Sequence, residues 1–187
     1  MKLKLILFFL MTTSFVFSSN LSTLYKLYEK QEYEKACNYA FKYFYKKQNK
    51  TNETYLTFYG LSCLETNHLS RIATPMMSLT KTEDSRANAS YFGTILLQKQ
   101  LLMQGLIDKK PLGDLYLPKT NFVLSKIFSL FVKEKYELKK GVYHFVDEQK
   151  SEITYQLYIK KKNKRSRQYM ILDIYKNEKF TKRYQYI

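Results

Sequence analysis

Few side chains in this sequence are of the sulfur or imidazole type that binds zinc or carries out redox chemistry. They are two cysteines, Cys37 and Cys63, and two histidines, His68 and His144. A zinc site needs three or four such ligands, usually with some at close spacing. These four are scattered along the chain, so we expect no metal and no cofactor. We expect a capping or surface role for His68 and a structural role for His144 on a strand.

The two cysteines lie on the apolar stripes of two predicted helices. In an exported protein such a pair favours a disulfide. A bridge between Cys37 and Cys63 would close a loop of about 25 residues and stabilise the fold by about 3.5 kcal/mol in the chain-entropy model. The alternative is two buried free thiols that pack as small apolar side chains.

Paired carboxylates are the usual acid and base of glycoside hydrolysis. The close pairs here are Glu83-Asp84 and Asp147-Glu148, and both lie beside predicted turns. We interpret both pairs as solvated turn residues. The chain contains no Gly-rich phosphate loop and no Gly-x-Ser-x-Gly elbow. The residues therefore favour a non-catalytic protein, and the alternative is an enzyme whose site is assembled from scattered residues.

Positive charge dominates the chain, with 32 Lys and Arg against 16 Asp and Glu and a formal charge of +16. Such a charge attracts anions, although a lysine-rich composition alone would also produce it. The densest cluster lies in a predicted hairpin loop at 160–167. A solvated turn in a lysine-rich chain would explain this cationic hairpin, and the functional alternative is a contact with an anion. Its cations are Lys160, Lys161, Lys162, Lys164, Arg165 and Arg167.

The N-terminus has the order of a secretory signal peptide. Lys2 and Lys4 precede an apolar run that ends at Phe17, and small polar residues follow. The run is short for a bilayer span, which needs about 20 apolar residues. We predict a signal peptide over residues 1–18 with cleavage after Ser18, and an uncleaved anchor is the alternative. We expect no stable membrane span after cleavage and, because the protein is exported, no nucleic-acid partner.

Apolar residues recur at helical spacing through the first two thirds of the chain. The pattern predicts helices over 21–31 and 33–46, a polar loop at 48–54, a third helix that closes near 67–68, and a fourth over 69–81 that contains Pro75. A capping box at Thr80–Glu83 would start a long helix that reaches about residue 107. After a connector at 108–119, Thr120 would cap a helix over 121–133. That helix is apolar nearly all round and should be buried.

Alternating residues after Gly141 predict four strands. They start at Val142, Ile153, Tyr169 and Phe180, and Asn177-Glu178 would form the last turn. A sheet this small needs a cover on one face, and the helix at 121–133 is the natural one. We therefore predict an α+β fold with a signal peptide at 1–18, helical hairpins at 19–110, and a connector, buried helix and four-stranded antiparallel meander at 111–187.

Two resemblances accompany these patterns. Tyr33-Glu-Lys-Ala36 and Tyr59-Gly-Leu61 resemble tetratricopeptide repeats, with Ile72 at the position of the second repeat's alanine. The chain as a whole resembles a group of uncharacterised small periplasmic proteins of epsilon-class proteobacteria. That resemblance is carried by the stretches Tyr33–Cys37, Tyr59–Glu65, Arg86–Phe92 and Leu117–Thr120.

The resemblances imply a periplasmic location and, for the repeat, protein binding. We therefore expect a non-catalytic exported protein-interaction or envelope-associated module. Its partner would be another envelope protein or an anionic envelope component, met through the aromatic-rich helical surface or through the cationic hairpin.

Overall fold

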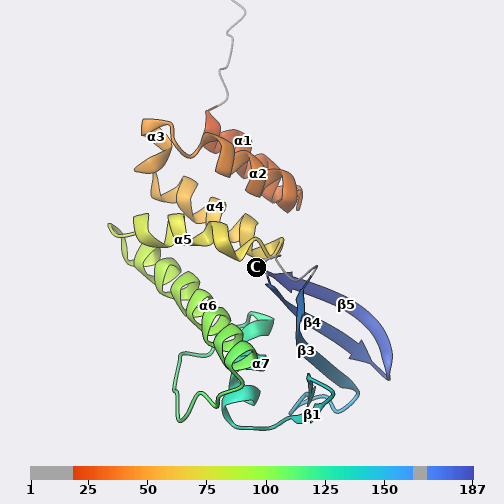
Figure 1. The fold of residues 1–187 in the computed structure, drawn as a ribbon. Helices are drawn as coiled ribbons and strands as arrows, with labels where there is room; N and C mark the ends of the chain where they lie inside the picture. Colours follow the sequence, from red (N-terminus) through yellow and green to blue (C-terminus); the bar gives the residue numbers. More distant parts are fainter. Residues whose placement is uncertain (1–18, 162–167) are drawn as a thin grey trace, which may run out of the picture.

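The computed structural model describes residues 19–161 and 168–187, so the predicted signal peptide lies outside the described residues. Helices come first and one antiparallel sheet follows, which confirms the α+β fold (Figure 1). The described helices are α1 Asn20–Glu29, α2 Tyr33–Tyr43, α3 Lys47–Lys50, α4 Glu53–Glu65, α5 Leu69–Ser78, α6 Glu83–Asp108 and α7 Val123–Val132.

The first four long helices form two hairpins, as the spacing predicts. Gln31 adopts a positive φ of 57° between α1 and α2, and Asn67 adopts 61° between α4 and α5. The loop predicted at 48–54 was wrong in part, because it contains the short helix α3 and the start of α4. Asn52 caps α4 by accepting a hydrogen bond from the Tyr55 amide at 3.0 Å.

The start of α6 also differs from its prediction. Thr82, not Thr80, is the N-cap, and its Oγ1 accepts a hydrogen bond from the Ser85 amide at 3.2 Å. Thr80 lies in the turn that follows α5, where its amide donates to Glu53 at 2.8 Å, two residues before the helix is capped. Pro75 lies inside α5, which ends at Ser78 and not at residue 81.

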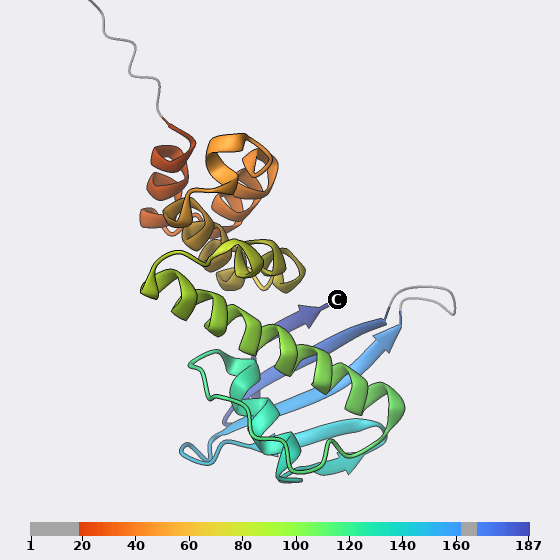
Figure 2. The same cartoon turned by 90° about the vertical axis from the view of Figure 1, so that its left-hand side faces the viewer.

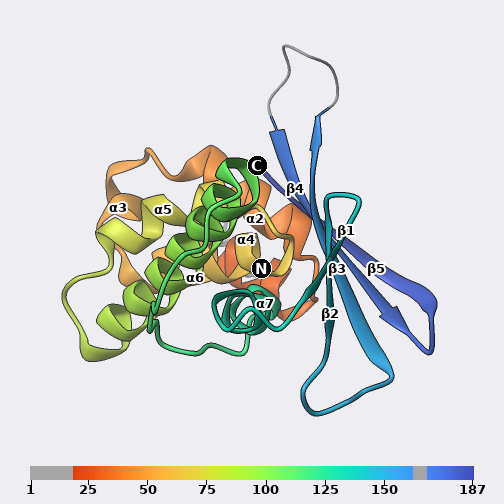
Figure 3. The same ribbon diagram turned by 60° about the horizontal axis from the view of Figure 1, so that its bottom comes forward.

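The apolar helix α7 is buried as predicted, although it begins later than Thr120. Phe122 occupies the N-cap position, and Thr120 instead accepts a hydrogen bond from the Phe122 amide at 3.3 Å. Figures 2 and 3 show α7 between α6 and the sheet. The buried residues of α7 are Leu124, Ser125, Ile127, Phe128, Leu130 and Phe131.

The sheet has five strands in sequence order, one more than predicted. The additional strand is β1 Glu137–Lys139, which has three exposed residues and therefore shows no alternation. The others are β2 Val142–Val146, β3 Ile153–Lys161, β4 Gln168–Lys176 and β5 Lys179–Tyr186. The turn at Asn177-Glu178 is confirmed, with positive φ at both residues.

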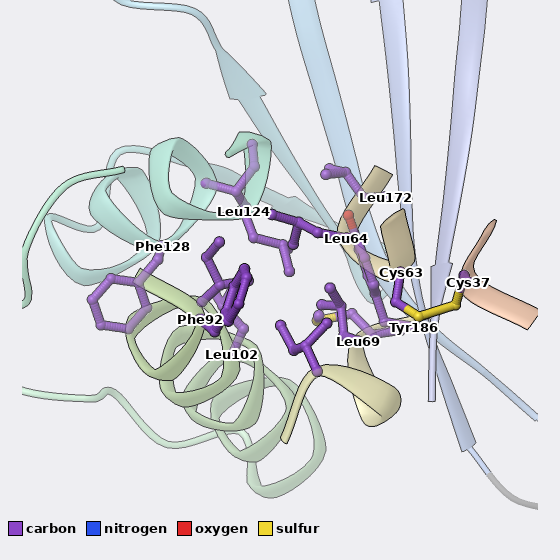
Figure 4. Packing of buried hydrophobic residues seen from close by; sticks show 14 of the residues in the cluster. Cys37, Cys63, Leu64, Leu69, Phe92, Leu102, Leu124, Phe128, Leu172 and Tyr186 are labelled. Carbon is purple, nitrogen blue, oxygen red and sulfur yellow. A yellow bond between two sulfur atoms is a disulfide. The ribbon is translucent and has the colours of Figure 1, made fainter. Parts of the chain in front are cut away.

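One hydrophobic core joins the helical hairpins to the sheet. In Figure 4, Tyr186 of β5 lies beside Cys63 and Leu69 from the helical hairpins, and the same core contains Phe92 and Leu102 of α6 and Phe128 of α7. Lys99 of α6 is buried, and its ammonium donates to the carbonyl of Ile187. The end of the sheet is therefore packed into the helical part.

Candidate binding surfaces

The predicted disulfide between Cys37 and Cys63 is confirmed. The two sulfurs are 1.99 Å apart and join α2 to α4, and neither cysteine is exposed. Arg71 on α5 covers the bridge, with its Nη1 3.6 Å from Cys37 Sγ and 2.7 Å from Asn38 Oδ1. Three helices are therefore held together around one covalent link.

Neither histidine lies in a cluster of metal ligands. His68 immediately precedes α5, and its Nε2 lies 3.0 Å from Glu34 Oε1. The hydrogen bond with His68 lowers the pKa of Glu34. His144 lies opposite Gln156 on the neighbouring strand. Across residues 19–161 and 168–187, no three His, Cys, Asp or Glu side chains gather closely enough to hold a metal ion.

The prediction for the acidic pair at 147–148 was wrong for Asp147, which is only 4% exposed. Its Oδ1 accepts hydrogen bonds from the amides of Gln149 and Lys150 at 2.9 and 3.2 Å. Its Oδ2 accepts from Lys126 Nζ and from the Tyr155 hydroxyl, both at 2.6 Å. Burial alone would raise the pKa of Asp147, but the hydrogen bonds outweigh it and hold the pKa well below its usual range.

This carboxylate is one wall of a cavity of about 180 Å³ between the connector, α7 and the β2–β3 turn. Both oxygens of Asp147 already accept two hydrogen bonds each, so this carboxylate has no acceptor position left with which to take a proton from a substrate. Nearby Ser125 Oγ accepts from the Thr120 amide at 2.9 Å and lies 3.2 Å from Gln98 Nε2. These contacts brace the turn and the connector against α7.

A second surface has the opposite character, because it is cationic and exposed. Residues 41–50 read FKYFYKKQNK, with four lysines and four aromatic residues, and residues 36–52 contain no Asp or Glu. We define the basic-aromatic patch as seven cationic or aromatic side chains of this segment that are exposed or half-exposed; Phe44, which packs against the core, is not included. They are Phe41, Lys42, Tyr43, Tyr45, Lys46, Lys47 and Lys50. It lies where α2 ends and α3 begins, near the end of the molecule away from β1 (Figure 1).

Cations and rings alternate closely within the patch. Lys46 Nζ is 4.8 Å and Lys42 Nζ 5.3 Å from the centroid of the Tyr43 ring, and Lys50 Nζ is 5.2 Å from that of Tyr45. The Arg71 guanidinium lies 4.6 Å from the Phe41 ring. Tyr45 is 73% exposed and Phe41 49% exposed, so the rings reach solvent beside the charges.

The backbone beneath the patch is held by buried polar contacts. Asn49 is 3% exposed, and its Nδ2 donates to the Tyr43 carbonyl at 2.6 Å. The buried Tyr55 hydroxyl donates to the Ala40 carbonyl at 2.8 Å. The nearest following carboxylate, Glu53, accepts from the amides of Thr80, Lys81 and Thr82 and pairs with no patch lysine. Across the described residues 19–161 and 168–187, none of the ion pairs involves a patch lysine.

The third surface is the face of the sheet that points away from the helices (Figure 3). Arg183 on β5 donates from Nε and Nη2 to the two oxygens of buried Asp173 at 2.7 and 2.8 Å, and its Nη2 is 3.1 Å from the Tyr158 hydroxyl. Because Ile174 pairs with Lys182 and Tyr175 with Phe180, Thr181 is a bulge. The bulge places Phe180 opposite Tyr175 on this face.

The structure describes only the start of the predicted cationic hairpin. Lys160 and Lys161 are exposed at the end of β3, while Lys162, Lys164, Arg165 and Arg167 lie outside the described residues. The basic-aromatic patch was not predicted as a site. A count of charges in a short window would have found it, because no acidic residue interrupts the lysines of 41–50.

Comparison with protein families, with curated proteins and with solved structures found no match to the chain. The tetratricopeptide-like and epsilon-proteobacterial resemblances therefore stay predictions. Among the described helices, none is both long and apolar enough to cross a bilayer. The arguments about function below depend on the geometry of the chain's own residues.

Proposed function

We propose that the protein is an exported, non-catalytic module of the periplasm that binds an anionic component of the cell envelope through the basic-aromatic patch. Export is proposed from the N-terminal sequence, and a disulfide is typical of proteins in an oxidising compartment. The observation that carries the proposal is the set of four exposed lysines on a braced backbone, with no carboxylate among residues 36–52.

The test is binding of the purified protein to beads coated with dextran sulfate, over a series of salt concentrations. The patch variant replaces Lys42, Lys46, Lys47 and Lys50 with Gln. Each cation near an anionic surface is worth about 1 kcal/mol, or about fivefold in binding, so we expect at least a tenfold loss. Salt should weaken binding of the natural protein more steeply than binding of this variant.

A matched control removes the same charge elsewhere. Lys110, Lys139, Lys176 and Lys179 are exposed and lie outside the patch, and their replacement with Gln should reduce binding less than threefold. An equal loss in both variants would mean that net charge alone binds the beads. A third variant that replaces the six cations of the cationic hairpin with Gln tests that competing site, and a loss in this variant alone would move the site to the hairpin.

A second candidate function is docking of a protein partner on the open face of the sheet. It is supported by Arg183, which is about half exposed while Asp173 and Tyr158 hold its guanidinium in one orientation. Arginine and tyrosine held in this way are typical of binding hot spots. A photo-crosslinking residue at Tyr175 should capture a defined envelope protein, and the same residue at exposed Leu97 on α6 should not.

A further inference from the structure

We infer that the anionic component recognised by the basic-aromatic patch is the surface of a phospholipid bilayer, into whose headgroup layer Phe41 and Tyr45 insert. This inference rests on the proposed function and specifies its ligand. It differs from binding to an anionic polymer, for which charge alone would be enough. The two aromatic side chains and their relation to the lysines favour the bilayer.

The first argument is the position of the two exposed rings. Phe41 lies in the last turn of α2, and Tyr45 follows two residues after the helix ends, so both rings belong to the corner between α2 and α3. They are 49% and 73% exposed, although the core offers room for many other aromatic residues. Exposed rings grouped beside a charged cluster are typical of a surface that contacts a membrane or another protein.

The second argument is that the cations lie beside the rings and not apart from them. Lys50 lies 5.2 Å from the Tyr45 ring, and Arg71 lies 4.6 Å from the Phe41 ring. At a bilayer interface, aromatic rings sit at the level of the headgroups while lysine stems cross the apolar boundary and leave the ammonium near phosphate. The patch therefore places cations beside exposed rings, as an interfacial contact requires.

The third argument is that the patch is fixed before any ligand binds. Asn49 closes the corner between α2 and α3, and the disulfide holds α2 against α4. The backbone that carries the rings and cations is therefore held before binding, which favours binding by a preformed surface. Attachment by one small patch should be reversible, as it is for peripheral proteins with a single weak anchor.

The direct test uses tryptophan fluorescence, because the natural chain contains no Trp. The variant Tyr45→Trp carries one reporter in the patch, and Tyr116→Trp carries one on the connector, where Tyr116 is 94% exposed. The probe is a vesicle of phosphatidylglycerol and phosphatidylcholine. We expect a blue shift and quenching by brominated lipid for Trp at 45, and neither for Trp at 116.

A second pair of variants separates apolar insertion from charge. The variant Phe41→Gln/Tyr45→Gln should lose at least fivefold in binding to anionic vesicles and less than twofold in binding to dextran sulfate. Its control is Tyr116→Gln/Leu138→Gln, which removes two exposed apolar side chains outside the patch and should lose neither. Circular dichroism establishes whether each variant is folded. If a Gln variant does not fold, the fluorescence test still applies, because it uses the separate Trp variants.

The outcomes separate this inference from the proposed function. The proposed function and the bilayer inference are both supported if the lysine variant loses binding to dextran sulfate and to vesicles while the aromatic variant loses binding to vesicles only. If the protein binds dextran sulfate through the patch while Trp at 45 shows no shift on vesicles, the bilayer inference is overturned and the proposed function stands. If the lysine variant keeps both ligands, the proposed function is overturned.

Discussion

Asp147 shows how distant residues change the role of a single side chain. Its position after β2 suggests a solvated turn, yet Lys126 of α7 and Tyr155 of β3 enclose it. Burial in these contacts also raises the pKa of Tyr155. A buried carboxylate that accepts four hydrogen bonds has a structural role, because replacing it leaves the four donors without an acceptor.

We predict that Asp147→Asn lowers the free energy of unfolding by about 2 kcal/mol, since an amide cannot accept all four hydrogen bonds. Urea unfolding at pH 7 measures the loss. The matched control is Asp114→Asn on the exposed connector, which should change stability by less than about 0.5 kcal/mol. A variant as stable as the natural protein would contradict the contacts described for Asp147.

Acid should destabilise the protein through two carboxylates. The pKa of Asp147 is lowered, and that of Glu53 is lowered to about 2 because the amides of Lys81, Thr80 and Thr82 outweigh the opposing effect of burial. A folded-state pKa below the unfolded value gives stability that is complete above about pH 4.5 and is lost as the pH falls toward the folded value. We expect the midpoint urea concentration to stay nearly constant from pH 7 to about pH 4.5 and to decrease from there to pH 2. The decrease should be smaller in Asp147→Asn.

At the scale of elements, α4 and α6 come into close contact at a glycine. Phe92 of α6 lies against Gly60 of α4, where an added Cβ would come within 2.3 Å of the ring. Phe92 has no exposed surface and so has no free space into which to move. Gly60 is therefore required by packing, although alanine is the better helix former.

We predict that Gly60→Ala lowers the free energy of unfolding by about 1–2 kcal/mol, because overpacking exceeds the gain in helix propensity. The control is Gly93→Ala, where the nearest contact is the flexible Met76 side chain at 3.3 Å. That variant should be neutral or slightly stabilised. Urea unfolding compares the two, and equal effects would contradict the close contact of α4 with α6.

The elements that the sequence predicted well are those with a long periodic pattern, such as α6, α7 and the strands from β2 to β5. The missed ones, α3 and β1, have only four and three residues, which is too short for a period to show. The disulfide could be predicted because both cysteines lie on apolar stripes. The burial of Asp147 could not, because Lys126 and Tyr155 belong to other elements.

At the scale of the whole molecule, Tyr186 ties the sheet to the helices. Its side chain is 1% exposed and lies beside Cys63 and Leu69 in the core (Figure 4). Among the described residues, its hydroxyl has no hydrogen-bond partner. The ring therefore stabilises the contact between the two parts while the buried hydroxyl opposes it.

We predict opposite effects for two substitutions at this residue. Tyr186→Phe should raise the free energy of unfolding by about 1 kcal/mol because it removes the unpaired hydroxyl. Tyr186→Ala should lower it by about 3–5 kcal/mol and keep one cooperative transition, since the core is continuous. Thermal unfolding followed by circular dichroism in the far and near ultraviolet measures both. Two separate transitions in Tyr186→Ala would show that the sheet and the helices unfold independently.

The short helix α3 and the open face of the sheet lie on opposite sides of the molecule (Figure 3). A molecule held by its lysines and rings would thus turn its Arg183 side toward the surrounding fluid. It could hold a membrane and a soluble protein at once, as an adaptor does. Recruitment of this kind raises the local concentration of the captured protein and strengthens weak encounters without any added contact.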